Sequence, residues 1–252
     1  MTLDSRLPDS STLMPEPFLS IVIPAYNEAR RIRDTLERVS HFRESQAYAV
    51  ELIVVDDGST DHTDETVAEF PGIRLVRNDR NHGKGFTVRH GVLEARGELV
   101  LFSDADLSTP IEEVDKLLLA LQSSGADAAV GSRALNRELI GIHQPWLRDM
   151  AGRFFNLLVK VFTGLRLHDT QCGFKLFRRI STRTAFELMK VEGFGFDPEL
   201  LFLIERHGGR VLEVPVRWDN HPATKVRFLR DSTEMFLDLI AIRWRALTGK
   251  YQ

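Results

Sequence analysis

The sequence predicts an α/β protein with a mainly parallel sheet flanked by helices, in a single domain. The main observation is that short β-branched runs alternate with amphipathic stretches through the first half of the chain. A second is composition, because 252 residues with 43% hydrophobic and 27% charged side chains are typical of a globular core. A third is that no low-complexity linker divides the chain after residue 17. We therefore expect one domain whose second half builds on the first.

The first half supplies the parallel strands. Strands are expected at LSIVI (19–23), ELIVV (51–55), IRLVR (73–77), ELVLF (98–102) and DAAVG (127–131). Amphipathic patterns predict helices between them, over roughly 28–44, 61–70, 84–96 and 110–123. Because ligands collect at the carboxyl ends of parallel strands, the loops that follow these strands are where a site is expected.

The second half is less regular. Strands are expected at FKLF (174–177) and RVLEVPV (210–216), and helices near 146–164, 181–190, 197–207 and 230–247. By domain, residues 1–17 are expected to form a disordered lead, residues 18–230 the globular domain, and residues 231–252 an amphipathic C-terminal helix able to lie on a membrane surface.

Charge and cysteine content exclude several classes of protein. The net charge of −3 gives no case for a nucleic-acid partner. Cys172 is the only cysteine, so no internal disulfide can form and a reducing compartment is expected. The first 17 residues lack a signal-peptide pattern, and no uncharged apolar run reaches the ~20 residues that span a bilayer. We expect a cytoplasmic protein that is soluble or at most peripheral to the membrane.

The segment SDADLSTP (103–110) carries the strongest chemical signal. Asp104 and Asp106 follow a buried strand, where two carboxylates can share a hard cation such as Mg²⁺ or Mn²⁺. The alternative is a helix cap, and we assign Thr109 and Glu112 to a capping box with Pro110 at the first helical position. That box leaves the two aspartates unexplained, which favours the metal interpretation.

The other segments that follow predicted strands are weaker evidence for a site when each is taken alone. Asp56 and Asp57 in DDGSTD (56–61) can accept hydrogen bonds from a base or ribose, while the rest of that segment is expected to form a turn and a helix cap. PAYNE (24–28) can be a packed turn that starts a helix. Lys84 lies between two glycines without Walker spacing; it can approach a phosphate, or lie on a flexible surface turn.

Taken in order, these segments resemble the family-two inverting glycosyltransferases with the GT-A fold. The resemblance covers roughly residues 18–230 and is carried by IVIPAYNEARRI, ELIVVDDGSTDHT, NHGKGFTVRHG, ELVLFSDADLSTP, VGSR and DTQCGFKLFRR. Within that family the chain is most similar to the branch that transfers hexoses to dolichyl and other polyprenyl phosphates. HDTQCGFKLF (168–177) favours the glucosyl members.

The resemblance also implies roles for individual residues. The residues implied to bind the nucleotide donor are Pro24, Tyr26, Glu28, Asp56, Asp57, Lys84, Asp104 and Ala105. Asp104 and Asp106 match the metal-binding pair, and Arg133 matches a basic residue near the sugar or phosphates. Asp169 matches an acidic residue beside the sugar and acceptor. Ser108 stands where mannosyl members often carry a glutamine, which favours glucose.

We therefore expect transfer of a hexose, with inversion, from UDP-glucose (or GDP-mannose) to a polyprenyl phosphate. A hydroxyl acceptor would need Asp169 as a general base, whereas a phosphate is already ionised near neutral pH and needs cations. Lys225 and Arg227 are assigned to that phosphate. The alternatives are a transferase acting on a saccharide or other hydroxyl, and a nucleotide-sugar-binding protein without turnover.

A lipid acceptor requires contact with a membrane surface. The segments 146–165 and 235–251 are amphipathic and rich in aromatic and basic residues, so either can lie among lipid headgroups. The alternative is that both pack on the sheet or form an oligomer contact.

Overall fold

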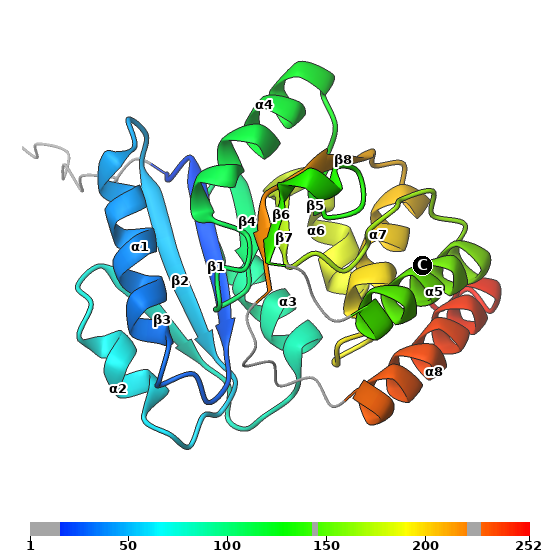
Figure 1. Ribbon diagram of the computed structural model, residues 1–252, viewed down its shortest axis with the longest axis horizontal. Helices are drawn as coiled ribbons and strands as arrows, with labels where there is room; N and C mark the ends of the chain where they lie inside the picture. Colours follow the sequence, from blue (N-terminus) through cyan, green and yellow to red (C-terminus); the bar gives the residue numbers. More distant parts are fainter. Residues whose placement is uncertain (1–15, 143–145, 221–227) are drawn as a thin grey trace, which may run out of the picture.

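A seven-stranded sheet forms the centre of the molecule and helices cover both of its faces (Figure 1). The structure is a computed structural model that describes residues 16–142, 146–220 and 228–252. The strand order is β3-β2-β1-β4-β7-β5-β8. The strands are β1 Leu19–Ala25, β2 Val50–Asp56, β3 Ile73–Arg77, β4 Leu99–Ser103, β5 Ala128–Ser132, β7 Phe174–Arg178 and β8 Val211–Pro215. The expected α/β class and mainly parallel sheet are confirmed.

Helices divide between the two faces of the sheet. The α-helices are α1 Ile32–Ser45, α2 Thr63–Ala68, α3 Lys84–Glu94, α4 Val114–Ser124, α5 Trp146–Thr163, α6 Arg179–Leu188, α7 Phe196–Arg206 and α8 Phe228–Leu247. One core joins α1, α2 and α4 to the face of β1 that carries Leu19, Ile21 and Ile23. The other joins α3 and α5–α8 to the face that carries Val22. Strands buried on both faces explain the nearly continuous apolar runs in the sequence.

Strand β7 runs against its neighbours. It pairs antiparallel with β4, where Ser103 faces Phe174, and antiparallel with β5 on its other side. The other pairings in this sheet are parallel. Because of this reversal, the residues that precede β7 lie beside the residues that follow β4. The Asp104 amide accordingly donates to the Gly173 carbonyl oxygen at 2.9 Å.

The sequence did not reveal a small second sheet. Strands β6 (Ile140–Ile142) and β9 (Trp218–Asp219) pair in parallel, and a 3₁₀ turn, η2 (Arg137–Leu139), leads into β6. Strands of two or three residues are too short for a period-2 pattern to be recognised. The Asp219 amide donates to the Ser108 carbonyl at 2.8 Å, so this sheet lies against the loop after β4.

The expected capping box at Thr109 is wrong. A 3₁₀ turn, η1 (Ile111–Glu113), precedes α4, and no side chain caps either start. Thr109 is buried, with its hydroxyl 3.8 Å from the Cys172 sulfur, while Glu112 is exposed. The Thr109 hydroxyl therefore contacts the segment before β7 and does not cap a helix.

A buried carboxylate, Glu199 in α7, ties α8 to the body of the domain. It is fully buried and accepts the hydroxyl hydrogen of Tyr251, with the Arg245 guanidinium at 3.4 Å. Its other oxygen accepts the amides of Lys190 and Val191 at 2.9 and 2.7 Å. One side chain thus holds together α7, the end of the chain and the loop that follows α6.

Asp238 is a second acidic contact between α8 and this region. Its carboxylate lies against the Gly195 Cα, where an added Cβ would stand 2.4 Å from Oδ2. Burial and the nearby Glu199 charge raise the pKa of Asp238 from 3.8 to about 6, although Arg245 opposes the shift. The folded protein therefore holds this proton more tightly than the unfolded chain, and stability falls as pH rises from about 4 through about 6.

We expect Asp238→Asn to stabilise the protein at pH 7.5 by about 1 kcal/mol and to change little at pH 4. Urea unfolding of both proteins at the two pH values measures this. The matched control is Glu37→Gln, which removes an exposed carboxylate from α1. Equal unfolding midpoints for Asp238→Asn and the parent protein at pH 7.5 would contradict the assignment.

Candidate active site

A cleft with a volume of about 910 Å³ lies where β1 and β4 end. Its walls come from the loops after β1, β2, β3 and β4, from residues 193–194, and from the start of α8. Among the residues expected to bind the donor or a metal, those that line it are Pro24, Tyr26, Glu28, Asp57, Lys84, Asp104, Ala105 and Asp106. Asp56, Arg133 and Asp169 do not line it.

Lys84 and Asp104, which both line the cleft, form an ion pair. The Lys84 ammonium lies 2.7 Å from Asp104 Oδ1, and both side chains are partly exposed. Burial alone would lower the pKa of Lys84, but Asp104 and Asp197 raise it above its ordinary value. A protein cation therefore balances the first aspartate of the pair in this structure.

Asp106 stands on a constrained turn. Its Oδ1 accepts the Ser108 amide at 3.0 Å, and Leu107 between them has a φ of 45°, a conformation uncommon for a leucine. Thr35 fixes the same loop by donating to the Ala105 carbonyl at 2.6 Å. These contacts hold the Asp106 side chain beside the cleft.

The two aspartates fit a divalent cation of the Mg²⁺ or Mn²⁺ type. Both are carboxylates on one cleft wall, which is the oxygen donor set such ions prefer. Across the described residues, no group of three or more histidine, cysteine or acidic side chains is arranged to hold a metal.

Gly173 makes room for Asp104. An ideal Cβ built on Gly173 would lie 1.9 Å from Asp104 Oδ2, so a larger residue would displace the carboxylate. A glycine in TQCGF, just before a predicted strand, is the one local signal of this requirement, and it does not identify Asp104 as the partner.

The turn that carries Lys84 is anchored on two sides, so the alternative of a flexible surface turn does not hold. Asp57 accepts the His82 amide at 3.0 Å and the Gly83 amide at 2.9 Å. The Glu192 carbonyl accepts the Gly85 amide at 2.7 Å, and a Cβ on either glycine would collide with the 191–192 backbone. Both glycines are therefore required by close packing against this loop.

Asp56 is fully buried behind the cleft. Its Oδ1 accepts the Ser59 amide at 3.2 Å. Its Oδ2 has no hydrogen-bond donor among the described residues and lies 3.7 Å from the Arg77 guanidinium. One acceptor atom is therefore open, although the structure does not bring it to the cleft wall.

Arg31 is a cation of the cleft that the sequence analysis did not identify. It pairs with Glu28, whose Oε1 lies 2.7 Å from an Arg31 nitrogen. Burial would lower the pKa of Arg31, but Glu28, Asp106 and Asp104 raise it. In the sequence Arg31 is one of two adjacent arginines at the start of a helix, and nothing local distinguishes the one that faces the cleft.

Arg133 and Asp169 form a bidentate pair beside the cleft. The guanidinium donates to both carboxylate oxygens at 2.6 and 2.8 Å, and the amides of Arg133 and Gln171 each donate at 3.1 Å. Burial would raise the pKa of Asp169, but Arg133 and these donors lower it. A carboxylate held in this way orients a guanidinium and is a poor general base.

A second buried pair, also missed by the sequence analysis, lies behind Lys84. The Lys175 ammonium, fully buried in β7, lies 2.6 Å from Asp197 Oδ1 and donates to the Cys172 carbonyl at 2.5 Å. Burial raises the pKa of Asp197, although Lys175 and Lys84 oppose the shift. The ammonium groups of Lys84 and Lys175 lie over the Phe102 ring, 5.4 and 5.6 Å from its centroid. The charges therefore alternate in sign along the series Lys175, Asp197, Lys84 and Asp104.

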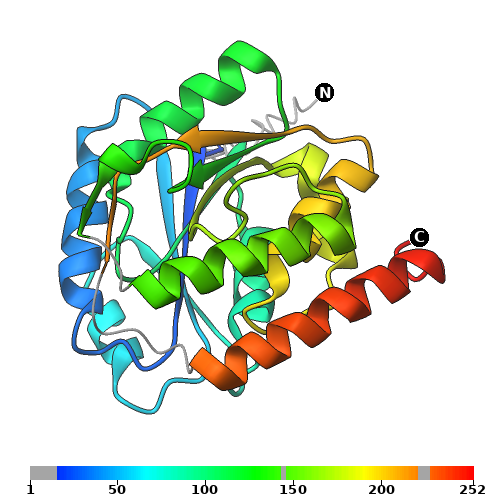
Figure 2. The same cartoon turned by 45° about the vertical axis from the view of Figure 1, so that its right-hand side comes forward.

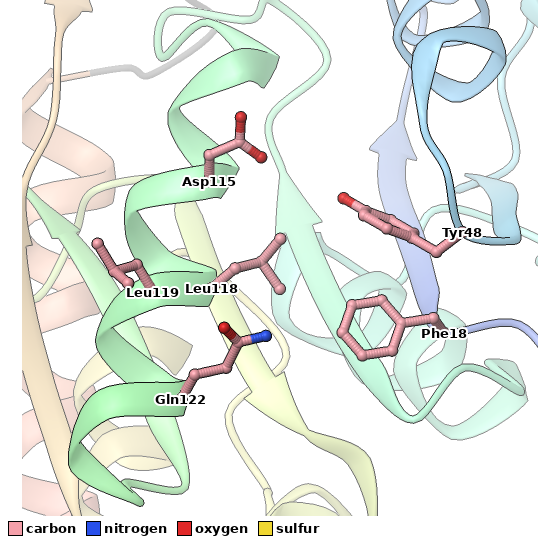
Figure 3. Close-up of a pocket in the computed structure, with 6 residues that line it drawn as sticks. All are labelled: Phe18, Tyr48, Asp115, Leu118, Leu119 and Gln122. Atoms are coloured by element: carbon pink, nitrogen blue, oxygen red, sulfur yellow. The ribbon is translucent and has the colours of Figure 1, made fainter.

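A smaller hollow of about 400 Å³ lies between α4 and the start of β1 (Figure 3). The Phe18 and Tyr48 rings lie on one side and Leu118 on the other. The Tyr48 hydroxyl has no hydrogen-bond partner among the described residues. None of the expected site residues lines this hollow.

Lys225 and Arg227, expected to contact an acceptor phosphate, lie outside the described residues.

We expect Arg133→Ala to destabilise the protein by about 3 kcal/mol, because it leaves the Asp169 charge buried without its partner. The matched control is Arg183→Ala, which breaks the exposed Arg183–Glu187 pair and should cost less than about 0.5 kcal/mol. Urea unfolding measures both. The double variant Arg133→Ala/Asp169→Ala should recover part of the loss. Equal losses of unfolding free energy in Arg133→Ala and Arg183→Ala would show that the Arg133–Asp169 pair does not stabilise the fold.

Comparisons with known proteins agree with this architecture. The family model described as glycosyl transferase family 2 matches residues 20–186. The dolichyl-phosphate beta-glucosyltransferase of Saccharomyces cerevisiae is 36% identical over 94% of this chain and 77% of its own length. The Homo sapiens enzyme of the same name is 32% identical over 94% and 78%.

Solved structures share the fold at low identity. Glucosyl-3-phosphoglycerate synthase from Mycobacterium tuberculosis, in complex with Mn²⁺, UDP and glucosyl-3-phosphoglycerate, superposes with a TM-score of 0.67 at 20% identity, covering 90% of this chain and 80% of that one. Mannosyl-3-phosphoglycerate synthase from Rubrobacter xylanophilus gives 0.67 at 19% identity, over 93% and 75%. These likenesses confirm the GT-A fold. The family model and the two relatives named above show that this chain belongs to glycosyltransferase family 2.

Proposed function

We propose that this glycosyltransferase moves a hexose, glucose in preference to mannose, from a nucleotide-diphosphate donor to a polyprenyl phosphate, with inversion. The observation that carries the proposal is the cleft itself, in which Asp104 and Asp106 lie beside Lys84 and Arg31. Paired carboxylates with nearby cations suit a metal-bound diphosphate. The curated relatives named for glucose transfer to dolichyl phosphate support the choice of sugar and acceptor.

The donor, UDP-glucose in our proposal, lies along the cleft wall. Tyr26 presents an exposed ring there, next to Pro24 and Glu28, which gives a face for the base. Asp57 positions the Lys84 turn, and we assign the Lys84 ammonium to the diphosphate. We also assign Asp56 to a hydrogen bond from the base or ribose, since its Oδ2 has no hydrogen-bond donor among the described residues.

Asp104 and Asp106 are the residues proposed to hold Mg²⁺ or Mn²⁺. A cation there, when bound, neutralises charge that develops on the departing diphosphate. The Mycobacterium tuberculosis synthase of the same fold was solved with Mn²⁺ and UDP, which supports a metal of this class. The Ala105 backbone between the two aspartates completes this wall of the cleft.

The acceptor is proposed to be a phosphate because Asp169 cannot serve well as a base. Its two oxygens receive four N–H donors, and its lowered pKa leaves it weakly basic. A phosphate monoester is already largely ionised near neutral pH, so its oxygen can attack the anomeric carbon as the bond to the donor diphosphate breaks. We assign Arg133 to orient the phosphates, and Lys225 and Arg227 to bind the acceptor.

The lipid chain of such an acceptor needs an apolar surface near the cleft. Helices α5 and α8 lie side by side (Figure 2). The Phe162 ring of α5 is in edge contact with the Phe236 ring of α8. Among the side chains that the structure describes, the large exposed apolar ones of the two helices are Trp146, Met150, Phe154, Leu157, Val161, Phe236, Leu237, Ile240, Trp244 and Leu247. We call these residues the helical face. Apart from the adjacent Phe236 and Leu237, they are spaced three or four residues apart, which forms a stripe along each helix.

We propose that the helical face lies on the cytoplasmic surface of a membrane. Lys250 lies over the Trp244 ring at 4.1 Å, a pairing suited to the headgroup region. The start of α8 also lines the cleft, so the same helix touches both the proposed donor site and the proposed lipid surface. Among the described residues, no helix combines the length and the apolarity that a bilayer crossing requires.

The purified protein, mixed with labelled UDP-glucose, a short polyprenyl phosphate and Mn²⁺, should form an acid-labile glycolipid that a chelator prevents. Asp106→Asn should lower the rate at least about 100-fold, because it removes a proposed metal ligand. Parallel reactions with GDP-mannose test the sugar. The matched control is Asp115→Asn on α4, outside the cleft. Donor binding without glycolipid would favour a hydroxyl acceptor, and no donor binding would contradict the proposal.

Replacing Phe154 and Trp244 together with serine should weaken binding to vesicles of anionic and neutral lipids at least about tenfold, because two large exposed apolar groups are lost. Sedimentation with vesicles measures this. The matched control is Leu119→Ser, since Leu119 is 67% exposed but lies on α4. Unchanged sedimentation of the double variant would exclude the helical face as the membrane contact.

A further inference from the structure

Lys84 occupies a carboxylate oxygen that a metal ion would need. Its ammonium lies 2.7 Å from Asp104 Oδ1. Resting on the function proposed above, we propose that Lys84 and the divalent cation exclude one another on Asp104, so that the cation binds tightly only with a diphosphate that accepts Lys84.

The charges of the cleft explain why the cation alone binds weakly. Arg31 is paired with Glu28, and Lys84 with Asp104. Of the two aspartates proposed to hold it, a dication that enters without donor therefore meets Asp104 already paired with Lys84, and Asp106 in no ion pair with a lysine or arginine of the described chain. It also meets the Lys84 ammonium at close range, and this repulsion is twice that between two single charges.

The surroundings of Lys84 let its side chain move while its backbone stays fixed. Asp57 and the Glu192 carbonyl hold the amides of Gly83 and Gly85 on either side of it. The ammonium also lies over the Phe102 and Phe194 rings, at 5.4 and 6.0 Å, and aromatic faces attract a cation without fixing its direction. A diphosphate in the cleft can therefore draw Lys84 away from Asp104 by rotation of the side chain alone.

Two opposite effects follow for a variant without the ammonium. In Lys84→Met both oxygens of Asp104 are open, so Mn²⁺ alone should bind at least about tenfold more tightly than to the parent protein. With UDP present the variant lacks a diphosphate contact, so UDP should tighten Mn²⁺ binding less than it does in the parent protein. A merely structural role for Lys84 would weaken both complexes.

The experiment is a titration of the purified protein with Mn²⁺, in which free Mn²⁺ is followed by electron paramagnetic resonance with and without UDP. The variants are Lys84→Met and Lys84→Arg, of which the second keeps the charge and should resemble the parent. The control is Lys116→Met, which removes an ammonium that is paired with Glu113 and does not line the cleft. Circular dichroism melting checks that each variant is folded. If Lys84→Met does not fold, Lys84→Gln takes its place.

The outcomes separate this inference from the proposed function. Tighter binding of Mn²⁺ alone by Lys84→Met, with a smaller gain from UDP, supports mutual exclusion. Equal or weaker binding of Mn²⁺ alone overturns it, even where the parent protein binds Mn²⁺ well with UDP. If the parent protein binds no Mn²⁺ even with UDP, the proposed metal site itself fails. Asp106→Asn identifies the site, because it should reduce Mn²⁺ binding in both backgrounds.

Discussion

The antiparallel pairing of β7 between β4 and β5 determines how the cleft is built. In the parallel strands, residues reach the cleft edge after the strand ends, as Asp104 and Asp106 do. In β7 the residues before the strand reach the same edge, which places Gly173 beside the loop after β4 and Asp169 beside Arg133, which follows β5. The fit of the Asp104 carboxylate against the Gly173 Cα depends on this reversal. The strand also carries Lys175 to its partner Asp197 behind the cleft.

The second constraint is electrostatic. Burying a charge is costly unless a partner of opposite sign accompanies it. Removing one partner of a buried pair destabilises a protein more than replacing both partners with apolar residues. Beside the cleft, Lys175 pairs in this way with Asp197, and Arg133 with Asp169. The paired groups come from different elements, so the pairs also fix those elements relative to each other. The cleft is thereby preorganised before any ligand binds.

Much of the fold could be predicted from the sequence, because strands buried on both faces leave long β-branched runs. β3 was expected at the residues it occupies, and the other six strands of the large sheet within about two residues at either end. Strands β6 and β9 could not be found, since neither is long enough to show a period. Thr109 was assigned to a cap because local spacing cannot show that its hydroxyl faces a distant segment.

The candidate site was predicted unevenly for a related reason. Polar residues after a predicted strand are conspicuous, and most of these line the cleft. Lys175, Asp197 and Glu199 lie inside strands or helices, where a single charge resembles an ordinary solvent-facing residue. Their only local signal is the apolar flank, as in FKLF and GFGFDPELLF. Their partners are more than 20 residues away for Lys175 and Asp197, and more than 50 for the Tyr251 contact of Glu199, so spacing cannot reveal them.

The buried carboxylate of Glu199 has a thermodynamic consequence. It joins Tyr251 and Arg245 to the amides of Lys190 and Val191, and the adjacent Glu192 carbonyl holds the turn that carries Lys84. Docking of α8 and order in the Lys84 turn are therefore linked equilibria. By reciprocity, the free energy that α8 docking contributes to order in the Lys84 turn equals the free energy that an ordered turn contributes to α8 docking. A surface that binds docked α8 therefore favours an ordered turn, and a ligand that orders the turn favours docked α8.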